Sequence, residues 1–385
     1  MQLRSVRLDG GRTGEAGLPL ELDSEATLVL VFGASNLLDR PGPLIDLVRA
    51  FPRSKAIGCS TAGEIFGRQG GQRAGVGDDS LVVAVARFAA TRLATASAPV
   101  SAADQSFTAG EAIGRQLAGE GLRGVHVLSD GLLVNGSELV RGLSSVLPGG
   151  VVVTGGLAGD GDRFARTWVL HEGAPASGQV TAVGFYGDRV VIGHGSAGGW
   201  DPFGPRRLVT RSKDNVLYEL DGKPALELYK QYLGERADGL PATGLLFPLA
   251  LSRSEGGGRT VVRTILAVDE ATQSLTFAGD IPTGAYAQLM KAQLDRLIEG
   301  AEDAAGRARG DATGDTLAVA ISCVGRRLVL RDRSDEEVEA VQEALPAGTQ
   351  VVGFYSYGEL SPSASGDCDL HNQTMTLTTI RERAS

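Results

Sequence analysis

The sequence predicts an α/β fold made of repeated β-α-β units, with mixed sheets covered by helices and two associated domains. Three observations lead to this prediction. Short apolar runs rich in β-branched residues alternate with helical patterns along the chain. A strand–helix–strand pattern recurs three times. Glycines cluster directly after the apolar runs, which is where α/β proteins place their ligand-binding loops.

The first unit begins with the apolar run TLVLVF at 27–32, which predicts a strand. A helix should begin at Pro43, because proline is tolerated at the first helical position. A second strand is expected near 55–58. The segment GCSTAGEI, at 58–65, follows it.

The second unit repeats this order. Strands are predicted at 125–128 and 151–154. Asn135, with an acid three residues later, can cap the helix between these strands. The segment GGLAGDG, at 155–161, follows the second strand.

The third unit lies near the C-terminal end. Strands are predicted at 316–321 and 351–354, and Ser334 and Glu337 are spaced as a capping box for the helix between them. The segment GFYSYGEL, at 353–360, ends the unit.

The three unit ends align on a glycine followed by an acid, in the pairs Gly63–Glu64, Gly159–Asp160 and Gly358–Glu359. A larger duplication is also predicted. Two strands, a helix, a strand, a helix and a strand occur in this order over about 80–160 and again over about 260–360. Its hairpin-like pairs would be 80–97 and 260–279, and its leading helices 106–119 and 284–300.

Three segments are expected along the chain. Residues 1–25 form a polar lead-in, 26–222 form a first domain and 223–385 form a second. The join is placed near 222 because Pro224 can begin a helix there.

The composition excludes several classes of protein. Hydrophobic residues make up 42% and charged residues 22%, as in soluble globular proteins and unlike disordered ones. The net charge of −9, without a dense Lys/Arg stripe, argues against nucleic-acid binding. The three cysteines contain no CxxC pair, so neither a zinc ribbon nor a disulfide framework is expected. No leader pattern or apolar run of about 18 residues occurs, so we expect a cytoplasmic protein without a membrane span.

Several short motifs, taken together, resemble the FIST (F-box and intracellular signal transduction) family. They follow the family's order along nearly the whole chain: GCSTAGEI at 58–65, SDGL at 129–132, GGLAGDG at 155–161, GHGSAGGW at 193–200, NVLYELDGKPALELY at 215–229, SCVGR at 322–326, GFYSYGEL at 353–360 and HNQT at 371–374.

The resemblance implies a FIST N-terminal domain followed by a FIST C-terminal domain. It implies a sensor of small ligands, with amino acids as a candidate class, that acts in signal transduction. Family members are often fused to, or encoded near, histidine kinases, diguanylate cyclases or chemoreceptor-type proteins. This chain carries no recognisable output domain, so its output would come from a separate partner. No cofactor is implied.

Glu64, Asp160 and Glu359 are candidates to line one pocket between the two halves. A glycine after a strand lets a ligand approach the backbone closely, and a carboxylate beside it can accept hydrogen bonds from an ammonium group. The alternative is that each acid caps a helix or ties down its own turn. Both interpretations stay open at this stage.

Further candidates for ligand binding surround these acids. Ser60, Thr61 and Ser196 could orient a polar ligand through their hydroxyls, or bond to nearby backbone. Arg326 could hold a ligand carboxylate, or pair with Glu359 or another acid.

Aromatic and amide groups complete the candidate site. Trp200 and Tyr357 could form a wall of the pocket or pack between the domains. His371, Asn372 and Gln373 form a polar cluster that is costly to bury without partners, so it should be exposed, bonded into a site, or brace the loop of Glu359.

An amino acid suits this inventory, because its ammonium needs acids and its carboxylate needs an arginine or backbone N–H groups. A ligand that bridges the two halves would favour a closed arrangement through its higher affinity for that state.

Two alternatives to the sensor differ in class. One is a small-molecule hydrolase that uses Cys59, which follows a strand as nucleophiles do. However, no G-x-S-x-G elbow occurs, and none of the four histidines stands in a signature that would supply its base. The other is an interaction scaffold that binds no ligand. No motif for a metal, nucleotide or dinucleotide is present, so we expect neither a cofactor nor an enzyme.

Overall fold

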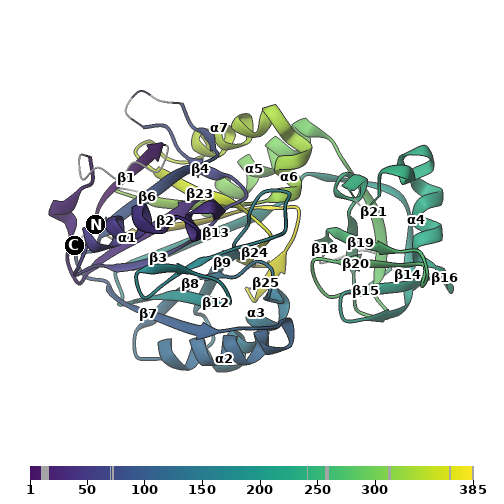
Figure 1. Ribbon diagram of the computed structural model, residues 1–385, viewed down its shortest axis with the longest axis horizontal. Helices are drawn as coiled ribbons and strands as arrows, with labels where there is room; N and C mark the ends of the chain where they lie inside the picture. The colour runs from purple at the N-terminus through teal and green to yellow at the C-terminus, as the bar shows by residue number, and fades with distance from the viewer. Residues whose placement is uncertain are drawn as a thin grey trace.

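The computed structural model describes residues 1–9, 17–69, 71, 73–240, 242–255, 260–310, 314–363 and 366–383. The chain forms a large body (residues 1–199 and 293–383) and a small β module (residues 200–292), which lies to one side of the body (Figure 1). The chain therefore crosses between the two parts twice, once near 199 and once near 293.

The body contains three six-stranded sheets. The first has the order β1 (Gln2–Asp9), β6 (Ser80–Arg87), β2 (Thr27–Gly33), β3 (Lys55–Ser60), β10 (Val169–His171), β11 (Ala174–Ala176). The second has the order β7 (Arg92–Pro99), β12 (Gln179–Tyr186), β8 (Leu122–Ser129), β9 (Val152–Leu157), β24 (Gly358–Pro362), β25 (Cys368–His371). The third has the order β13 (Val190–Ala197), β26 (Met375–Glu382), β22 (Leu317–Cys323), β23 (Gln350–Ser356), β4 (Glu64–Phe66), β5 (Gly75–Gly77).

The three sheets share one plan. In each, the two central strands are parallel because a helical crossover joins them, as β2–β3, β8–β9 and β22–β23. The strand after each Gly-rich turn then leaves its own unit and pairs with another unit's sheet: β4 with β23, β10 with β3 and β24 with β9. The body is therefore a set of three interlocked β-α-β units, and the predicted α/β class with repeated units is confirmed.

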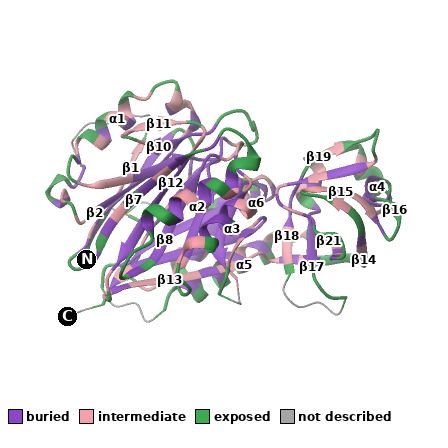
Figure 2. Cartoon of the chain, turned by 90° about the horizontal axis from the view of Figure 1, so that it is seen from below, coloured by how far each residue is buried: buried purple, intermediate pink, exposed green. Residues whose placement is uncertain are grey.

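Helices cover the outer faces of these sheets. The helix α1 (Gly42–Arg49) packs on the first sheet, and α2 (Ser106–Leu117) and α3 (Gly136–Val146) pack on the second. On the third sheet lie α5 (Leu294–Ala308), α6 (Val324–Leu330) and α7 (Ser334–Ala344). The inner faces of all three sheets share one apolar core, and Figure 2 shows central strands such as β2, β8 and β12 buried. No described helix is both long and apolar enough to cross a bilayer.

One of the two predicted helix caps is confirmed. The side chain of Asn135 accepts hydrogen bonds from the backbone N–H groups of Ser137 and Glu138, so it is the N-cap of α3. The Ser334–Glu337 capping box is wrong, because Ser334 already lies in the first turn of α7 and Glu337 is buried.

The small module is an eight-stranded sheet with one α-helix, α4 (Ala225–Leu233). Its strands are β14 (Trp200–Lys213), β15 (Val216–Leu220), β16 (Lys223–Pro224), β17 (Leu249–Ser252), β18 (Thr260–Arg263), β19 (Ile265–Asp269), β20 (Ser274–Phe277) and β21 (Tyr286–Ala292). It has its own apolar core.

The module corrects the predicted larger duplication. The strands near 260–279 belong to the module, and the predicted hairpin at 80–97 is wrong as well, because β6 lies in the first sheet and β7 in the second. In the body's third unit, the strands beside the parallel pair are β26 and β13 instead. The prediction failed because alternating apolar residues predict a strand but not the sheet to which it belongs. The start of the helix predicted at 284–300 is the strand β21, and α5 begins at Leu294.

Candidate functional site

The three Gly-rich turns meet at one end of the body. Each turn donates a backbone hydrogen bond to another: Gly159 N to Ser60 O (3.0 Å), Tyr357 N to Leu157 O (3.2 Å) and Ala62 N to Tyr355 O (2.8 Å). These bonds close a ring, so segments far apart in the sequence lie side by side. We refer to them as the turn ring.

The strand register changes one of the sequence equivalences. Glu64 pairs with Phe354, and Glu359 pairs in the same way with Gly156. The residue at the corresponding place in the second unit is Val169, which pairs with Cys59. The alignment of Asp160 with the two glutamates is therefore wrong, because residues 160–168 form an extra loop before β10.

Glu64 is held by hydroxyl groups on both sides. Its Oε1 accepts a hydrogen bond from Thr61 Oγ1 (2.5 Å), and its Oε2 accepts bonds from Ser80 Oγ (2.8 Å) and Ser80 N (3.2 Å). Since Glu64 lies in the third sheet and Ser80 in the first, this carboxyl group joins two sheets.

Glu359 repeats this arrangement in the third unit. Its Oε1 accepts a bond from Ser356 Oγ (2.6 Å), and its Oε2 accepts bonds from Thr374 Oγ1 (2.9 Å) and Thr374 N (3.4 Å). In the second unit, Val169 stands at the place of the acid. Ala158 and Gln179 stand at the places of the two hydroxyl-bearing residues. The acid and its hydroxyl partners are thus present or absent together.

Burial is the main influence on both glutamates. It raises the pKa of Glu64 to about 7 and that of Glu359 to about 8, although the hydroxyl donors act in the opposite direction. Within the described ranges, no Lys, Arg or His lies within ion-pair distance of either carboxyl group. Both acids therefore titrate near neutral pH, and their contacts are those of the turn-tying interpretation.

Asp160 holds the extra loop of the second unit. Its Oδ2 accepts hydrogen bonds from the backbone of Ala165 (3.1 Å) and Arg166 (3.0 Å), and Tyr357 donates its hydroxyl to Oδ1. The Tyr357 ring stacks on Phe164 with centroids 4.4 Å apart. Phe164 is 43% exposed and has a φ of +48°, so this loop presents an aromatic ring to solvent.

Arg326 is fully buried and clamps both chain crossings between body and module. Its Nε and Nη2 donate to Oε1 of Glu337 at 2.8 and 2.5 Å. Its Nη2 also donates to the carbonyl of Leu297 (2.6 Å), and its Nη1 donates to that of Gly198. The guanidinium thus pairs with Glu337 rather than with Glu359.

Glu337 connects this clamp to the turn ring. Its Oε2 accepts hydrogen bonds from Ser322 Oγ (3.1 Å) and from the hydroxyl of Tyr355 (2.6 Å). The carbonyl of Tyr355 is one of the acceptors in the turn ring. A continuous path of polar contacts therefore runs from the turns to both crossings.

The loop between β25 and β26, which contacts the module through Leu370 and Gln373, contains unpaired buried polar atoms. Asn372 is fully buried, and neither Oδ1 nor Nδ2 has a hydrogen-bond partner among the described residues. Gln373, also buried, has no partner there for Oε1, while its carbonyl accepts a bond from Trp200 Nε1 (2.7 Å). From the module, Arg263 donates to the carbonyl of Leu370 (2.9 Å).

The remaining candidates have more local contacts. His371 lies opposite Glu359 in the β24–β25 pair, and its Nε2 is 3.0 Å from the carbonyl of Ser361, so it braces that strand. Ser60 accepts a bond from the backbone of Trp168 (3.1 Å). Ser196 lies on β13, where its carbonyl accepts a bond from Arg307 (2.8 Å).

The cysteines next to these turns are poor nucleophiles. Burial raises the pKa of the Cys59 thiol well above its ordinary value and raises that of Cys323 to about 12. Both thiols are therefore protonated at neutral pH. In the described part of the chain, no group of three or more His, Cys, Asp or Glu side chains could hold a metal ion.

Sequence reasoning missed four residues of this region. The sequence pattern predicts a helix cap for Glu337 and gives no role to Ser80, Thr374 or Arg263. Thr374 stands in the HNQT motif, so its position was visible in the sequence. The partners of Ser80 and Arg263 lie in other units, and nothing in the local sequence points to them.

Comparison with known proteins agrees with the motifs. The FIST N domain matches residues 27–223, and the FIST C domain matches residues 225–362. An uncharacterized protein of Methanocaldococcus jannaschii, MJ1623, is 24% identical over 241 residues, which is 54% of this chain and 45% of that protein. The chain thus matches about half the length of that relative.

Among solved structures, a cyanuric acid hydrolase from A. caulinodans aligns over 99% of both chains, with a TM-score of 0.37 and 11% sequence identity. A likeness of that size supports no inference about activity. The two domain matches together span most of the sequence and follow one another along it. The chain belongs to the FIST family.

Proposed function

We propose that this protein is a cytoplasmic small-ligand sensor whose ligand binds at the junction between the body and the small module. The observation that carries the proposal is Asn372, a fully buried amide without a hydrogen-bond partner in the described structure. Leaving such a group unpaired costs about 1–3 kcal/mol, so a polar ligand that pairs with it would bind favourably. FIST domains are associated with signal transduction, which supports a sensing role.

The chemistry of the junction favours an amino acid as the ligand class. An asparagine side chain offers two N–H donors and a carbonyl acceptor, so it can serve a carboxylate and an ammonium group together. The unpaired Oε1 of Gln373 adds a second acceptor. The buried guanidinium of Arg263 adds positive charge to this region. It donates a hydrogen bond to the carbonyl of Leu370, which lies two positions before Asn372 in the chain.

The clamp suggests how binding could be transmitted. Arg326 bonds to both crossings, and Glu337 and Tyr355 continue this network to the turn ring. A ligand that contacts both body and module would favour the arrangement in which it binds more tightly. The altered surface would then bind or release a separate output partner, such as a histidine kinase, a diguanylate cyclase or a chemoreceptor-type protein.

The test is isothermal titration of the full chain with each of the twenty amino acids. We expect saturable binding of at least one, weakened about tenfold or more by Asn372→Ala, because a ligand hydrogen bond in a buried site is worth about 1.4 kcal/mol or more. Asn36→Ala is the matched control, since Asn36 is bonded to Asp79 outside the junction. Equal affinity of both variants for the ligand would contradict the proposed site.

A further inference from the structure

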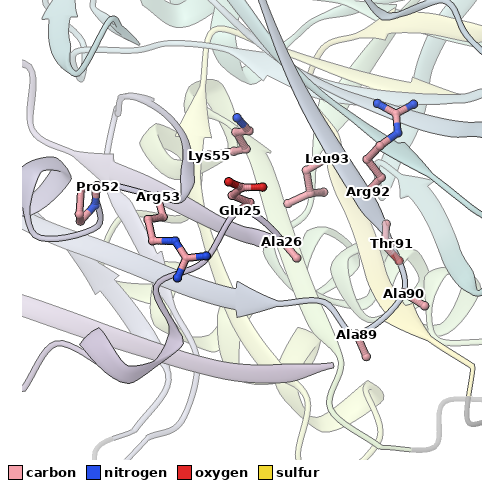
Figure 3. Close-up of a pocket in the computed structure, with 10 residues that line it drawn as sticks. All are labelled: Glu25, Ala26, Pro52, Arg53, Lys55, Ala89, Ala90, Thr91, Arg92 and Leu93. Carbon is pink, nitrogen blue, oxygen red and sulfur yellow. The ribbon is translucent and has the colours of Figure 1, made fainter.

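A groove of about 740 Å³ lies at the end of the body away from the turn ring. Three segments form it: Glu25–Ala26 before β2; Pro52 and Arg53 with the first residue of β3, Lys55; and residues 89–93, which end in the first two residues of β7 (Figure 3). The parallel strands β2 and β3 begin at this end and finish at the turns, so the groove and the junction are separate places. The groove is open to solvent, and Arg53 and Arg92 are exposed at its walls.

Positive charge dominates the lining of the groove. Arg53, Lys55 and Arg92 contribute three cations and Glu25 one carboxylate, a difference of two positive charges. The chain as a whole has a net charge of −9, so this excess is local. Within the described ranges none of the three cations lies within 4 Å of a carboxylate. Figure 3 shows Arg53 and Arg92 on opposite sides of Glu25 and Lys55.

Acidic side chains outside the lining fix the backbone of both walls. Glu382 accepts hydrogen bonds from Ala89 N (2.7 Å), Ala90 N (2.8 Å) and Thr91 Oγ1 (2.7 Å). Asp23 accepts bonds from Arg53 N (3.2 Å) and from the neighbouring Ser54 hydroxyl (2.6 Å). The carboxylates of Glu382 and Asp23 thus accept hydrogen bonds from the walls of the groove. The charged groups of the three lining cations form no ion pair with an acid in the described residues.

One of the cations is also held in place by an aromatic ring. The guanidinium of Arg92 lies 3.7 Å from the centroid of Tyr186. This contact restricts the side chain without neutralising its charge. The groove thus combines a backbone held by Glu382 and Asp23, one cation restrained by a ring, and two cations without a carboxylate within 4 Å in the described residues, which favours binding of an anion.

We propose that this groove binds a small molecule that carries two or more negative charges. Arginine and lysine form charge-assisted hydrogen bonds with phosphate and carboxylate oxygens alike, so multiple negative charge is the feature that they recognise. The lining has two positive charges in excess of Glu25, so a ligand with at least two negative charges neutralises it more fully than a monoanion does. This inference concerns a different place from the proposed sensor site and does not depend on it.

The experiment is isothermal titration of the full chain with pyrophosphate and with citrate, in a buffer of low ionic strength without other polyvalent anions. We expect saturable binding of at least one probe, with weaker binding at higher salt. Binding of pyrophosphate alone assigns phosphate ligands, and binding of citrate alone assigns carboxylate ligands. The absence of saturable binding of both probes overturns the proposal.

Variants then locate the binding. The double variant Arg53→Ala/Lys55→Ala should weaken binding about tenfold or more, which corresponds to about 1.4 kcal/mol. Glu25→Gln should strengthen it, because a repulsive charge is removed. Arg49→Ala is the matched control, since this exposed arginine of α1 carries the same charge outside the lining. Equal affinity of the double variant and the wild type, with thermal midpoints showing both folded, overturns the proposal.

Discussion

Arg326 and Glu337 form a fully buried ion pair, and the same guanidinium bonds to the carbonyls of Gly198 and Leu297. Gly198 stands just before the first crossing into the small module, and Leu297 just after the return. One side chain therefore fixes the point at which both crossings leave the body. A change at this ion pair would therefore affect both crossings.

Removing the clamp should destabilise the fold strongly. Arg326→Met leaves the Glu337 carboxylate buried without its cation, which is expected to cost about 3–5 kcal/mol. Arg333→Met is the control, because the ion pairs of Arg333 with Asp295 and Glu336 are exposed and should be worth less than about 1 kcal/mol. The measurement is urea denaturation of both variants, and equal losses of stability would show that the buried pair has no special role.

The double variant Arg326→Met/Glu337→Leu distinguishes the cost of an unpaired buried charge from the loss of the hydrogen bonds that hold the two crossings. It removes the unpaired charge, so it should recover much of the stability lost in the single variant. It cannot restore the bonds to Gly198 and Leu297. Limited proteolysis near the two crossings should therefore stay faster than in the wild type, and a cleavage rate equal to that of the wild type would contradict the clamp.

The two buried glutamates predict a dependence of stability on pH. Their ordinary pKa is 4.5, and burial raises it to about 7 for Glu64 and to about 8 for Glu359. Between these values the folded state binds more protons than the unfolded state, so stability should fall as pH rises through this window. The slope is on the order of 1.4 kcal/mol per pH unit for each acid.

Glutamine variants test this prediction. Glu359→Gln should flatten the decrease in stability up to about pH 8, and Glu64→Gln should do so up to about pH 7, because glutamine does not titrate. Urea denaturation over about pH 5 to 8 provides the measurement. A decrease of unchanged slope in both variants would show that other groups cause it.

The hydroxyl groups of Ser80 and Thr374 occupy equivalent positions in two units, so they should contribute similar amounts to the free energy of unfolding. Ser80→Ala and Thr374→Val each remove a hydroxyl donor to a buried glutamate, so each should cost about 1–3 kcal/mol. Gln179→Ala, at the corresponding place in the second unit, should change stability by less than about 0.5 kcal/mol, because Val169 stands at the position of the glutamate there. Thermal midpoints of the three variants compare them, and a loss in Gln179→Ala as large as the others would contradict the equivalence.

The cysteine next to the first turn should be unreactive. Cys59 is fully buried and its pKa is raised, so a thiol reagent should not label it in the native protein but should label it in urea. Mass spectrometry after timed alkylation gives the result. Rapid native labelling of Cys59, together with loss of a measurable turnover in Cys59→Ser, would favour the hydrolase alternative.

The repeated units could be predicted from the sequence, whereas the interlocking of their sheets could not. Strand and helix patterns depend on local periodicity, and the runs before Gly63 and Gly358 show it clearly. The strand β4, by contrast, pairs with β23, whose residues lie almost three hundred positions later in the chain. Val169 takes the position equivalent to the two glutamates because residues 160–168 form an extra loop, and no local sequence pattern predicts that loop.

The candidate site was predicted in part for the same reason. The Gly–acid pattern located the turns that meet, but not the partners of Arg326. A buried ion pair depends on tertiary packing, and the spacing of Ser334 and Glu337 fits a helix cap equally well in a single sequence. The cost of burying an unpaired amide predicts that Asn372 is exposed or hydrogen-bonded, whereas it is buried without a partner among the described residues.

The most direct test of the sensor proposal is a crystal structure of the full chain grown with a mixture of the twenty amino acids. The proposal predicts density for an amino acid within hydrogen-bond distance of both Oδ1 and Nδ2 of Asn372. Density for water alone at these atoms, or an amino acid bound elsewhere with Asn372 uninvolved, would contradict it.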